Sequence, residues 1–344
     1  MQHPLDRAPG RATLAVYAQP RLRRSVLDIV TSVVPYVAAS VALYLSLGVS
    51  YLLTVALMLP TAGFLVRTFV VFHDCAHGSL FVSKRANRYV GRVLGFFVLA
   101  PLERWRHDHA VHHATSGDLQ RRGVGDIITL TVSEYRARST RGRLAYRTIR
   151  NPLVMFGLGP VMAMMIGPRI PTRAQRPRMR HSVLGLDVML AVTVGLLCWL
   201  IGWQSFLIIW APPSLIAGAG GIWLFYVQHQ FEDAYWQSAP DWDYTEAALR
   251  GSSYLRMPAV LQFFTGSIGL HHVHHLNARI PNYNLQRAHD ENPCFGQVPT
   301  LSLRDALAAV RLKLWDESSG KLVGFAALKQ TEPPHPSRVI RPAA

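Results

Sequence analysis

The sequence predicts an all-α integral membrane protein with four transmembrane helices arranged as two hairpins, short interfacial helices and a cytosolic helical cap. Two observations support this fold class. Half of the 344 residues are hydrophobic, yet the formal net charge is +16. The apolar residues and the arginines also occupy separate stretches of the chain, which is typical of membrane spans with basic flanks.

The first hairpin is expected from two neighbouring apolar runs at 29–49 and 51–72. Each run is long enough to cross a bilayer core of about 30 Å at about 1.5 Å per residue. The link around Gly48–Ser50 carries no charge, so we expect a tight turn on the far side of the membrane. Arg67, near the end of the second run, either reaches back to the interface or marks a functional site.

The second hairpin is expected at 183–202 and 205–227, again with an uncharged turn. Its second arm contains prolines and glycines between Pro212 and Gly221, which membrane helices tolerate. These residues either allow close helix packing or leave room for a lipid tail. Two shorter apolar stretches, Gly91–Leu102 and Pro152–Gly167, are expected to be interfacial or re-entrant helices.

The arginines set the expected topology. Between the hairpins the chain from Lys84 to Arg180 is rich in arginine, and the positive-inside rule places it in the cytosol. Both termini are then cytosolic, and a bacterial inner membrane is the expected location. We expect a basic cytosolic segment at 1–26, a single membrane domain at 27–329 and a disordered, proline-rich tail at 330–344.

Most of the fifteen histidines gather at the cytosolic ends of the apolar runs. The segments "HDCAH", "HAVHH" and "HHVHH" space them by three or four residues, which places side chains on one face of a helix. Imidazole suits Fe, Zn, Cu and Ni, and such clusters on facing helices form metal sites. The candidate ligands are His73, His77, His109, His112, His113, His229, His271, His274 and His275.

Spacing also separates ligands from bystanders. The stretch "GLHHVHHLN" fits either H-x-x-H-H or the reverse order, H-H-x-x-H. The second box has the order H-x-x-H-H, and His107 lies about 200° around the helix from His109, at about 100° per residue. The same order in the third box leaves His272 as the spare histidine.

The number of histidines favours two metal ions. Structural zinc sites use four ligands and catalytic zinc sites use three, so nine histidines are too many for one zinc. Redox iron is the best candidate, because a membrane-embedded pair can activate O₂ near an apolar substrate. An isolated histidine such as His229 is more often a buried, hydrogen-bonded residue than a ligand, whereas two H-x-x-H-H boxes in one chain are specific.

At these boxes the sequence resembles the membrane fatty acid desaturases. Outside them it is similar to bacterial acyl-lipid desaturases, the group that includes delta-5 and delta-12 (omega-6) enzymes. The likeness is carried by the three boxes and by "HHATSGDLQRRGVGDIITLTVSEY", "FYVQHQFEDAYW" and "HHVHHLNARIPNYNL". It extends over most of the chain, from the first apolar run to "KLWDE".

The resemblance implies a non-haem diiron centre held by the nine histidines, with O₂ as oxidant and the acyl chains of membrane lipids as substrate. It also implies a reduced electron donor protein. We expect no fused cytochrome b5-like domain and therefore a separate ferredoxin-like or cytochrome b5-like donor. The basic face would attract an acidic donor, or its arginines only set topology and contact anionic lipids. We expect no nucleic-acid partner, and the oligomeric state is open.

Carboxylates are expected to orient the ligands by accepting the second ring N–H of a histidine. Each candidate is alternatively an interfacial charge or a helix cap. The candidates are Asp74, Asp108, Asp118, Glu232 and Asp233. A narrow apolar tunnel between the hairpins, lined by Trp223 and Phe225, is expected to hold the acyl chain.

Three alternative functions share part of this pattern. A hydroxylase or ketolase of the same superfamily has the same boxes, although the match outside the boxes favours desaturation. A zinc-dependent membrane hydrolase needs only three histidines and a water. A metal carrier would place its ligands within the spans, whereas these histidines follow at their cytosolic ends. Regioselectivity and the acyl carrier are not fixed by the sequence.

Overall fold

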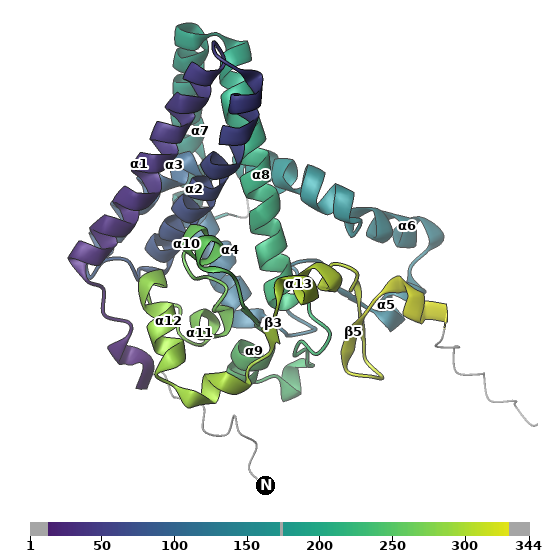
Figure 1. Ribbon diagram of the computed structural model, residues 1–344. Helices are drawn as coiled ribbons and strands as arrows, with labels where there is room; N and C mark the ends of the chain where they lie inside the picture. The colour runs from purple at the N-terminus through teal and green to yellow at the C-terminus, as the bar shows by residue number, and fades with distance from the viewer. Residues whose placement is uncertain (1–12, 173–174, 330–344) are drawn as a thin grey trace, which may run out of the picture.

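The computed structural model describes residues 13–172 and 175–329, and it confirms the predicted fold class. Among these residues four long helices are apolar enough to cross a membrane. They are α1 (Leu22–Ser46), α2 (Tyr51–His77), α7 (Pro177–Ile201) and α8 (Trp203–His229). They stand together above a cap of shorter helices (Figure 1). The tail predicted at 330–344 and residues 1–12 lie outside the described residues.

The four helices extend past the apolar runs at the ends that face the cap. Helix α1 begins at Leu22 rather than at 29, and α2 continues to His77 rather than ending at 72. Polar residues continue a helix when nothing interrupts its hydrogen bonds. Helix α2 ends where Gly78 adopts a left-handed conformation with φ 70°, which glycine allows without strain. The histidines at the end of α2 are therefore held on rigid helix.

Both hairpins turn within a few residues. A single residue, Gly202, separates α7 from α8, and its φ of 81° is one that residues with a side chain rarely adopt. The first hairpin turns between Ser46 and Tyr51, and the Ser46 hydroxyl lies 2.7 Å from the hydroxyl of Thr54 across it. These turns fix each hairpin as an antiparallel pair.

The outer surfaces of the long helices are apolar and uncovered. Only 6% of the most apolar part of α7 is buried inside the protein. Leu52 and Trp199, near the two hairpin turns, are 80% and 79% exposed. Surfaces of this kind are stable in lipid, where the surrounding medium is as apolar as the side chains.

The shorter helices form the cap and an arm beside α8. The helices are α3 (Lys84–Phe97), α4 (Leu102–Thr115), α5 (Val132–Ala137), α6 (Thr140–Ile149), α9 (Tyr244–Arg250), α10 (Ala259–Phe264), α11 (His271–Leu276), α12 (Asn282–Asp290) and α13 (Leu303–Ala309). Single 3₁₀ turns are η2 (Thr13–Val16), η6 (Ala239–Asp241), η7 (Pro293–Gln297) and η8 (Phe325–Lys329). The third-box helix α11 is held by a buried apolar cluster that includes Val273, Leu285 and Phe295.

The apolar stretch predicted at Pro152–Gly167 forms the inner part of the arm (Figure 1). It contains two π-helical turns, η3 (Val154–Leu158) and η4 (Val161–Ile166), and the 3₁₀ turn η5 (Gly167–Arg169) begins at its last residue. Together with α6 it makes a pair bent by 60°, which is either a broken span or a re-entrant loop. The other predicted stretch, Gly91–Leu102, lies at the end of α3 and the start of α4.

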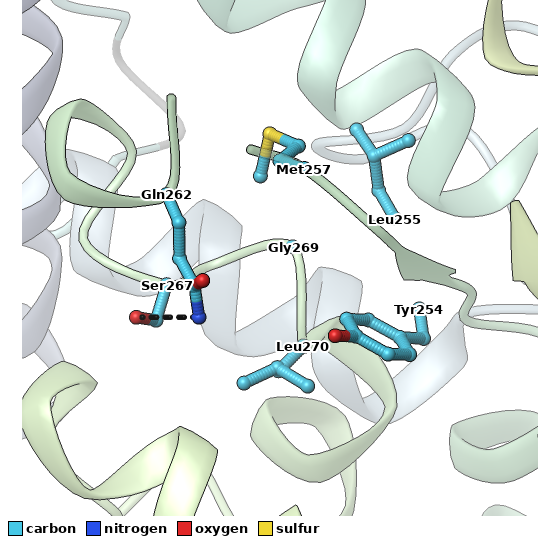
Figure 2. Close-up of a pocket in the computed structure, with 7 residues that line it drawn as sticks. All are labelled: Tyr254, Leu255, Met257, Gln262, Ser267, Gly269 and Leu270. Atoms are coloured by element: carbon cyan, nitrogen blue, oxygen red, sulfur yellow. Dashed lines mark hydrogen bonds between the residues drawn. The ribbon is translucent and has the colours of Figure 1, made fainter. Parts of the chain in front are cut away.

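Two small sheets, which the sequence did not predict, connect the C-terminal segment to the rest. Strand β1 (Leu130–Thr131) pairs in parallel with β4 (Leu314–Asp316), which pairs antiparallel with β5 (Lys321–Val323). Strand β2 (Tyr254–Leu255) pairs in parallel with β3 (Thr300–Leu301), with Tyr254 opposite Thr300. A separate antiparallel bridge between Tyr254 and Leu270 fixes β2 beside the segment that leads into α11 (Figure 2).

A buried polar network joins α1, α2 and α12. The Arg67 guanidinium of α2 lies 2.6 Å from the Asp28 carboxylate of α1, and both side chains are largely buried. The Asn282 amide of α12 donates to Asp28 at 2.6 Å. Arg67 also donates to the carbonyl of Phe263 and stacks on its ring. The two terminal nitrogens of Arg67 are therefore both bound to protein groups inside the apolar layer.

Replacing Arg67 with leucine is expected to destabilise the fold by about 3 kcal/mol, because the buried Asp28 charge would lose its partner. The measurement is unfolding of the detergent-solubilised protein followed by circular dichroism. The double variant Asp28→Leu/Arg67→Leu is the control, since it leaves no unpaired charge and should recover part of the loss. An Arg67→Leu protein as stable as the wild type would contradict the interpretation.

Candidate metal centre

The structure brings all nine candidate histidines together where the long helices meet the cap. They come from the end of α2, from α4, from the end of α8 and from α11. They form two groups, and within each group the potential ligand atoms lie within 4.8 Å of one another. The five-histidine group is His73, His77, His109, His113 and His274. The four-histidine group is His112, His229, His271 and His275.

In the five-histidine group the Nε2 atoms converge on one place. The Nε2 atom of His109 lies 3.0 Å from that of His73 and 3.1 Å from that of His113. The His113 Nε2 atom is 3.0 Å from the Nε2 atom of His274. The buried Nε2 atom of His77 has no hydrogen-bond partner among the described residues. Converging ring nitrogens of this kind suit a shared cation better than a chain of hydrogen bonds.

The four-histidine group has the same character. The His229 Nε2 atom lies 3.0 Å from that of His271 and 3.2 Å from that of His112. The buried Nε2 atom of His275 again has no partner within the described chain. The rings of His275 and His113 stack with centroids 4.1 Å apart, so the two groups are in direct contact.

The second and third boxes each supply both groups. On a helix the side chains at i and i+4 lie about 40° apart, whereas the one at i+3 lies about 60° to the other side. His109 and His113 accordingly join the five-histidine group, while His112 joins the other. His271 and His275 join the four-histidine group, and His274 of α11 joins the first. The shared face expected from spacing is thus divided between two positions.

Burial favours the neutral form of five of the imidazoles on α4 and α11. The pKa values of His109, His113, His271, His274 and His275 are lowered well below the usual 6.5, first by burial and then by the neighbouring histidines. Neutral imidazole is the form that binds metal, so no proton has to be displaced near neutral pH. The donor set therefore fits two first-row transition-metal ions.

Two contacts at Nδ1 atoms orient the four-histidine group, and neither was predicted. The Asp126 carboxylate lies 2.5 Å from the Nδ1 atom of His112. The Nδ1 atom of His229 lies 3.1 Å from the carbonyl oxygen of Gly251. Acceptors in these positions hold the ring proton on Nδ1 and leave Nε2 free for a ligand. A glycine before Asp126, Gly125 with φ 71°, forms the tight loop that brings the carboxylate back to α4.

Of the five predicted carboxylates, Asp74 is the one placed against a ligand candidate. One of its oxygens lies 3.6 Å from the Nδ1 atom of His73. The other accepts hydrogen bonds from the backbone and side-chain amides of Asn282, at 2.7 and 3.0 Å. Asn282 therefore fixes the carboxylate beside His73.

The structure places the other predicted carboxylates away from the nine histidines. Asp108 lies beside His107 at 3.2 Å. Asp118 caps its own loop, accepting from the Arg121 side chain at 2.5 Å. Glu232 and Asp233 lie at the surface, where both pair with Lys321. These acids are close to the boxes in sequence, but their local turns direct them elsewhere.

Both spare histidines are outside the two groups. His107 is nearly half exposed, with 46% of its side chain accessible. His272 is buried but points away from the groups, with its Nε2 atom 3.0 Å from the Nδ1 atom of His289. Its ring also contacts Phe295. His272 lies on a different face of α11 from His271, His274 and His275, and this directs its ring away from the two histidine groups.

The two predicted tunnel residues lie differently with respect to the histidines. The Phe225 ring contacts His112 and His229, with centroids 4.9 and 5.3 Å apart. Phe225 also lines a small cavity together with Asp126 and His229. Trp223 packs against an apolar cluster that includes Leu224 of α8 together with Met155 and Leu255.

Comparisons with known proteins agree with this site. A family model described as fatty acid desaturase matches residues 48–297. The chain is 44% identical over 316 residues to a fatty acid desaturase from Bacillus subtilis, covering 92% of this chain and 90% of that protein. It is 29% identical over 229 residues to the sn-1 oleoyl-lipid 12-desaturase of Synechocystis, covering 65% and 64%. It is also 29% identical over 232 residues to the Synechocystis sn-1 acyl-lipid omega-3 desaturase (ferredoxin), covering 64% and 62%.

Asp126→Ala is expected to weaken metal binding by about 10- to 100-fold at the four-histidine group, because His112 loses the acceptor that fixes its ring. The measurement is metal retained per chain during titration with a chelator. Asp233→Ala removes an exposed carboxylate that pairs with Lys321 and serves as the matched control. Equal metal retention in both variants would show that Asp126 does not orient a ligand.

Substitutions in the third box are expected to have graded effects on metal content. His271→Ala, His274→Ala and His275→Ala should each abolish loading of the metal centre, because each removes an imidazole from one of the two groups. His272→Ala should leave most of the metal in place, since this ring contacts His289 instead. Metal analysis of the purified variants measures the difference. If His272→Ala and His274→Ala lost metal equally, the assignment of His272 would be wrong.

Proposed function

The chain belongs to the fatty acid desaturase family, and we propose that it introduces a cis double bond into the acyl chains of membrane lipids, using O₂ and electrons from a separate protein. The observation that carries the proposal is the convergence of nine imidazoles, seven of them buried and two half-buried, on two positions where apolar helices end. The balanced reaction joins one –CH₂–CH₂– unit, O₂, two electrons and two protons to give –CH=CH– and two waters.

The proposed cofactor is a pair of non-haem iron ions, held by the five- and four-histidine groups. Alkyl C–H bonds are not acidic, so side-chain acids and bases cannot remove these hydrogens. When bound, the iron ions supply the oxidising power that this step requires. A zinc-dependent hydrolase would need only three of the nine imidazoles, which makes that alternative a poor account of the site.

The protein's own groups position the ligands and the substrate. Asp126 and the Gly251 carbonyl hold His112 and His229 so that their Nε2 atoms face inward. The Phe225 ring covers both histidines on the α8 side. We propose that the acyl chain lies along this apolar surface, with Trp223 above it, so that one methylene pair is held at the metal centre. Burial of the histidines also excludes bulk water.

The proposed partners follow from charge and from the relatives. One Synechocystis relative is named an acyl-lipid desaturase with ferredoxin, and another acts on oleoyl lipid by name. We propose a lipid-bound acyl substrate and an acidic, ferredoxin-like donor, with a cytochrome b5-like donor as the alternative. A chain of net charge +16 attracts such donors by long-range electrostatics. The arginines also favour a bacterial inner membrane with the cap and both termini in the cytosol.

Expression in a bacterium without desaturases, with a ferredoxin supplied, tests the proposed function. New double bonds should appear in the lipid acyl chains, and mass spectrometry should locate them at one position. His274→Ala is the inactive control because it removes a candidate ligand. Hydroxylated or oxo products would favour the alternative hydroxylase or ketolase function, and no product of either kind would contradict the proposal. Two irons per purified chain are expected, and one zinc would refute the diiron assignment.

A further inference from the structure

A single buried arginine joins several segments of the chain beside the four-histidine group. Arg150 follows α6 directly, and only 2% of it is exposed. Its guanidinium donates hydrogen bonds to the loop that follows Asp126, to the end of α8 and to the segment before β4. Arg150 is not one of the groups that surround the metal positions, so its place in the fold needs a separate explanation.

The acceptors of the Arg150 guanidinium are all uncharged. Its Nη1 atom donates to the Ile128 carbonyl at 3.1 Å. Its Nη2 atom donates to Gln230 Oε1 at 2.9 Å, and to the Tyr226 hydroxyl and the Leu312 carbonyl at 3.2 Å each. A buried cation is costly to desolvate, and these neutral groups offer it no opposite charge. What a planar guanidinium supplies is several donors in a fixed geometry, which holds separate segments in register.

A second contact ties the same loop to the same helix end. The Thr129 hydroxyl lies 3.2 Å from Gln230 Oε1, the atom that also accepts from Arg150. Thr129 and Gln230 are both buried, at 2% and 1% exposed. Gln230 directly follows His229, and its backbone N–H closes α8 by donating to the Tyr226 carbonyl at 2.8 Å. The end of α8 is thus the frame against which the loop is held.

The loop held in this way carries Asp126. Asp126 lies two residues before Ile128, and its carboxylate is 2.5 Å from the Nδ1 atom of His112. Its other oxygen accepts from the backbone of Gly123 at 3.3 Å, a contact within the loop itself. The residues just before Asp126 are exposed, whereas Thr129 after it is buried. The position of Asp126 relative to α8 therefore depends on the anchor that follows it.

This anchor serves one of the two histidine groups. His112 and His229 come from different helices, and their Nε2 atoms lie 3.2 Å apart. Asp126 orients the first ring, while the Gly251 carbonyl orients the second. By joining the Asp126 loop to the residue after His229, Arg150 fixes the two rings relative to each other. Its hydrogen bonds do not reach α2 or α11, so the five-histidine group lacks this support.

We propose that Arg150 is a positioning residue for the four-histidine group. It holds the Asp126 loop against the end of α8, so that the imidazoles of His112 and His229 share one orientation toward one metal ion. It acts through Asp126 and touches neither the substrate nor a ligand ring. The inference rests on the proposed function, because it names a residue that shapes one of the two positions of the proposed diiron centre.

Arg150→Met tests the proposal, because it keeps an apolar stem of similar length and removes the guanidinium. The measurement is metal retained per chain during titration of the loaded, detergent-solubilised protein with a chelator. One of the two ions should leave about 10- to 100-fold more readily, while the other is retained as in the wild type. Lys313→Met is the matched control, since the buried Lys313 amine lies over the Tyr226 ring without a hydrogen-bond partner in the described chain. It should retain both ions.

Two further variants separate positioning from a general loss of structure. Thr129→Val removes one hydroxyl of the same anchor and should release the same ion about two- to tenfold more readily. The double variant Arg150→Met/Asp126→Ala should hold that ion within about threefold of Asp126→Ala alone, because both changes act through one contact with His112. Additive losses in the double variant would contradict a role through Asp126.

The metal readout keeps this inference distinct from the proposed reaction. Selective release of one ion from Arg150→Met and Thr129→Val supports it, even if no variant forms a double bond. Wild-type retention of both ions in these two variants would overturn it, even if the wild type desaturates lipids. Equal release of both ions from Arg150→Met, with wild-type retention in Thr129→Val, would show that Arg150 only stabilises the fold, and this too would overturn the proposal.

Discussion

The convergence of nine imidazoles on two positions constrains the rest of the structure. Each ring must be brought to the site by a backbone that satisfies its own hydrogen bonds. Helix ends at the boundary of an apolar layer meet this need, because the layer excludes water while the cap supplies polar partners. This explains why α2 and α8 extend beyond their apolar runs to His77 and His229, and why α11 is packed in a buried cluster.

A chain of polar contacts connects this centre with the membrane helices. Arg67 binds Asp28, Asn282 binds both Asp28 and Asp74, and Asp74 lies beside His73. The chain joins α1 and α2 to α12, which follows the third box. A change in the packing of the first hairpin would therefore reach the histidines through hydrogen bonds as well as through van der Waals contact. Polar groups inside the apolar layer are costly, and here the charges of Asp28 and Arg67 are paired with each other.

Local patterns allowed the spans and the histidines to be predicted, since both depend on spacing along one helix. The positions of His73 and His77, or of the apolar run of α2, need no knowledge of distant residues. Asp126 was missed because its contact with His112 depends on a loop that returns to α4, and the carboxylates nearer the boxes were directed elsewhere by their own turns. The pairings of Tyr254 with Thr300 and of Leu130 with Leu314 join segments far apart in sequence, and strands of two or three residues carry almost no periodicity.

The division of each H-x-x-H-H box between two groups makes the helix backbone a spacer. In α11, His271 and His275 belong to one group and His274 to the other, and α4 repeats this division with His112 against His109 and His113. The offset between the two positions is thereby set by the rise and rotation of a single helical turn, which is nearly invariant among proteins. Thermal motion of either helix as a rigid body would shift ligands of both positions together. The separation of the two positions would then be kept by the hydrogen-bonded geometry of the helix, whereas tertiary packing decides only where the pair sits within the fold.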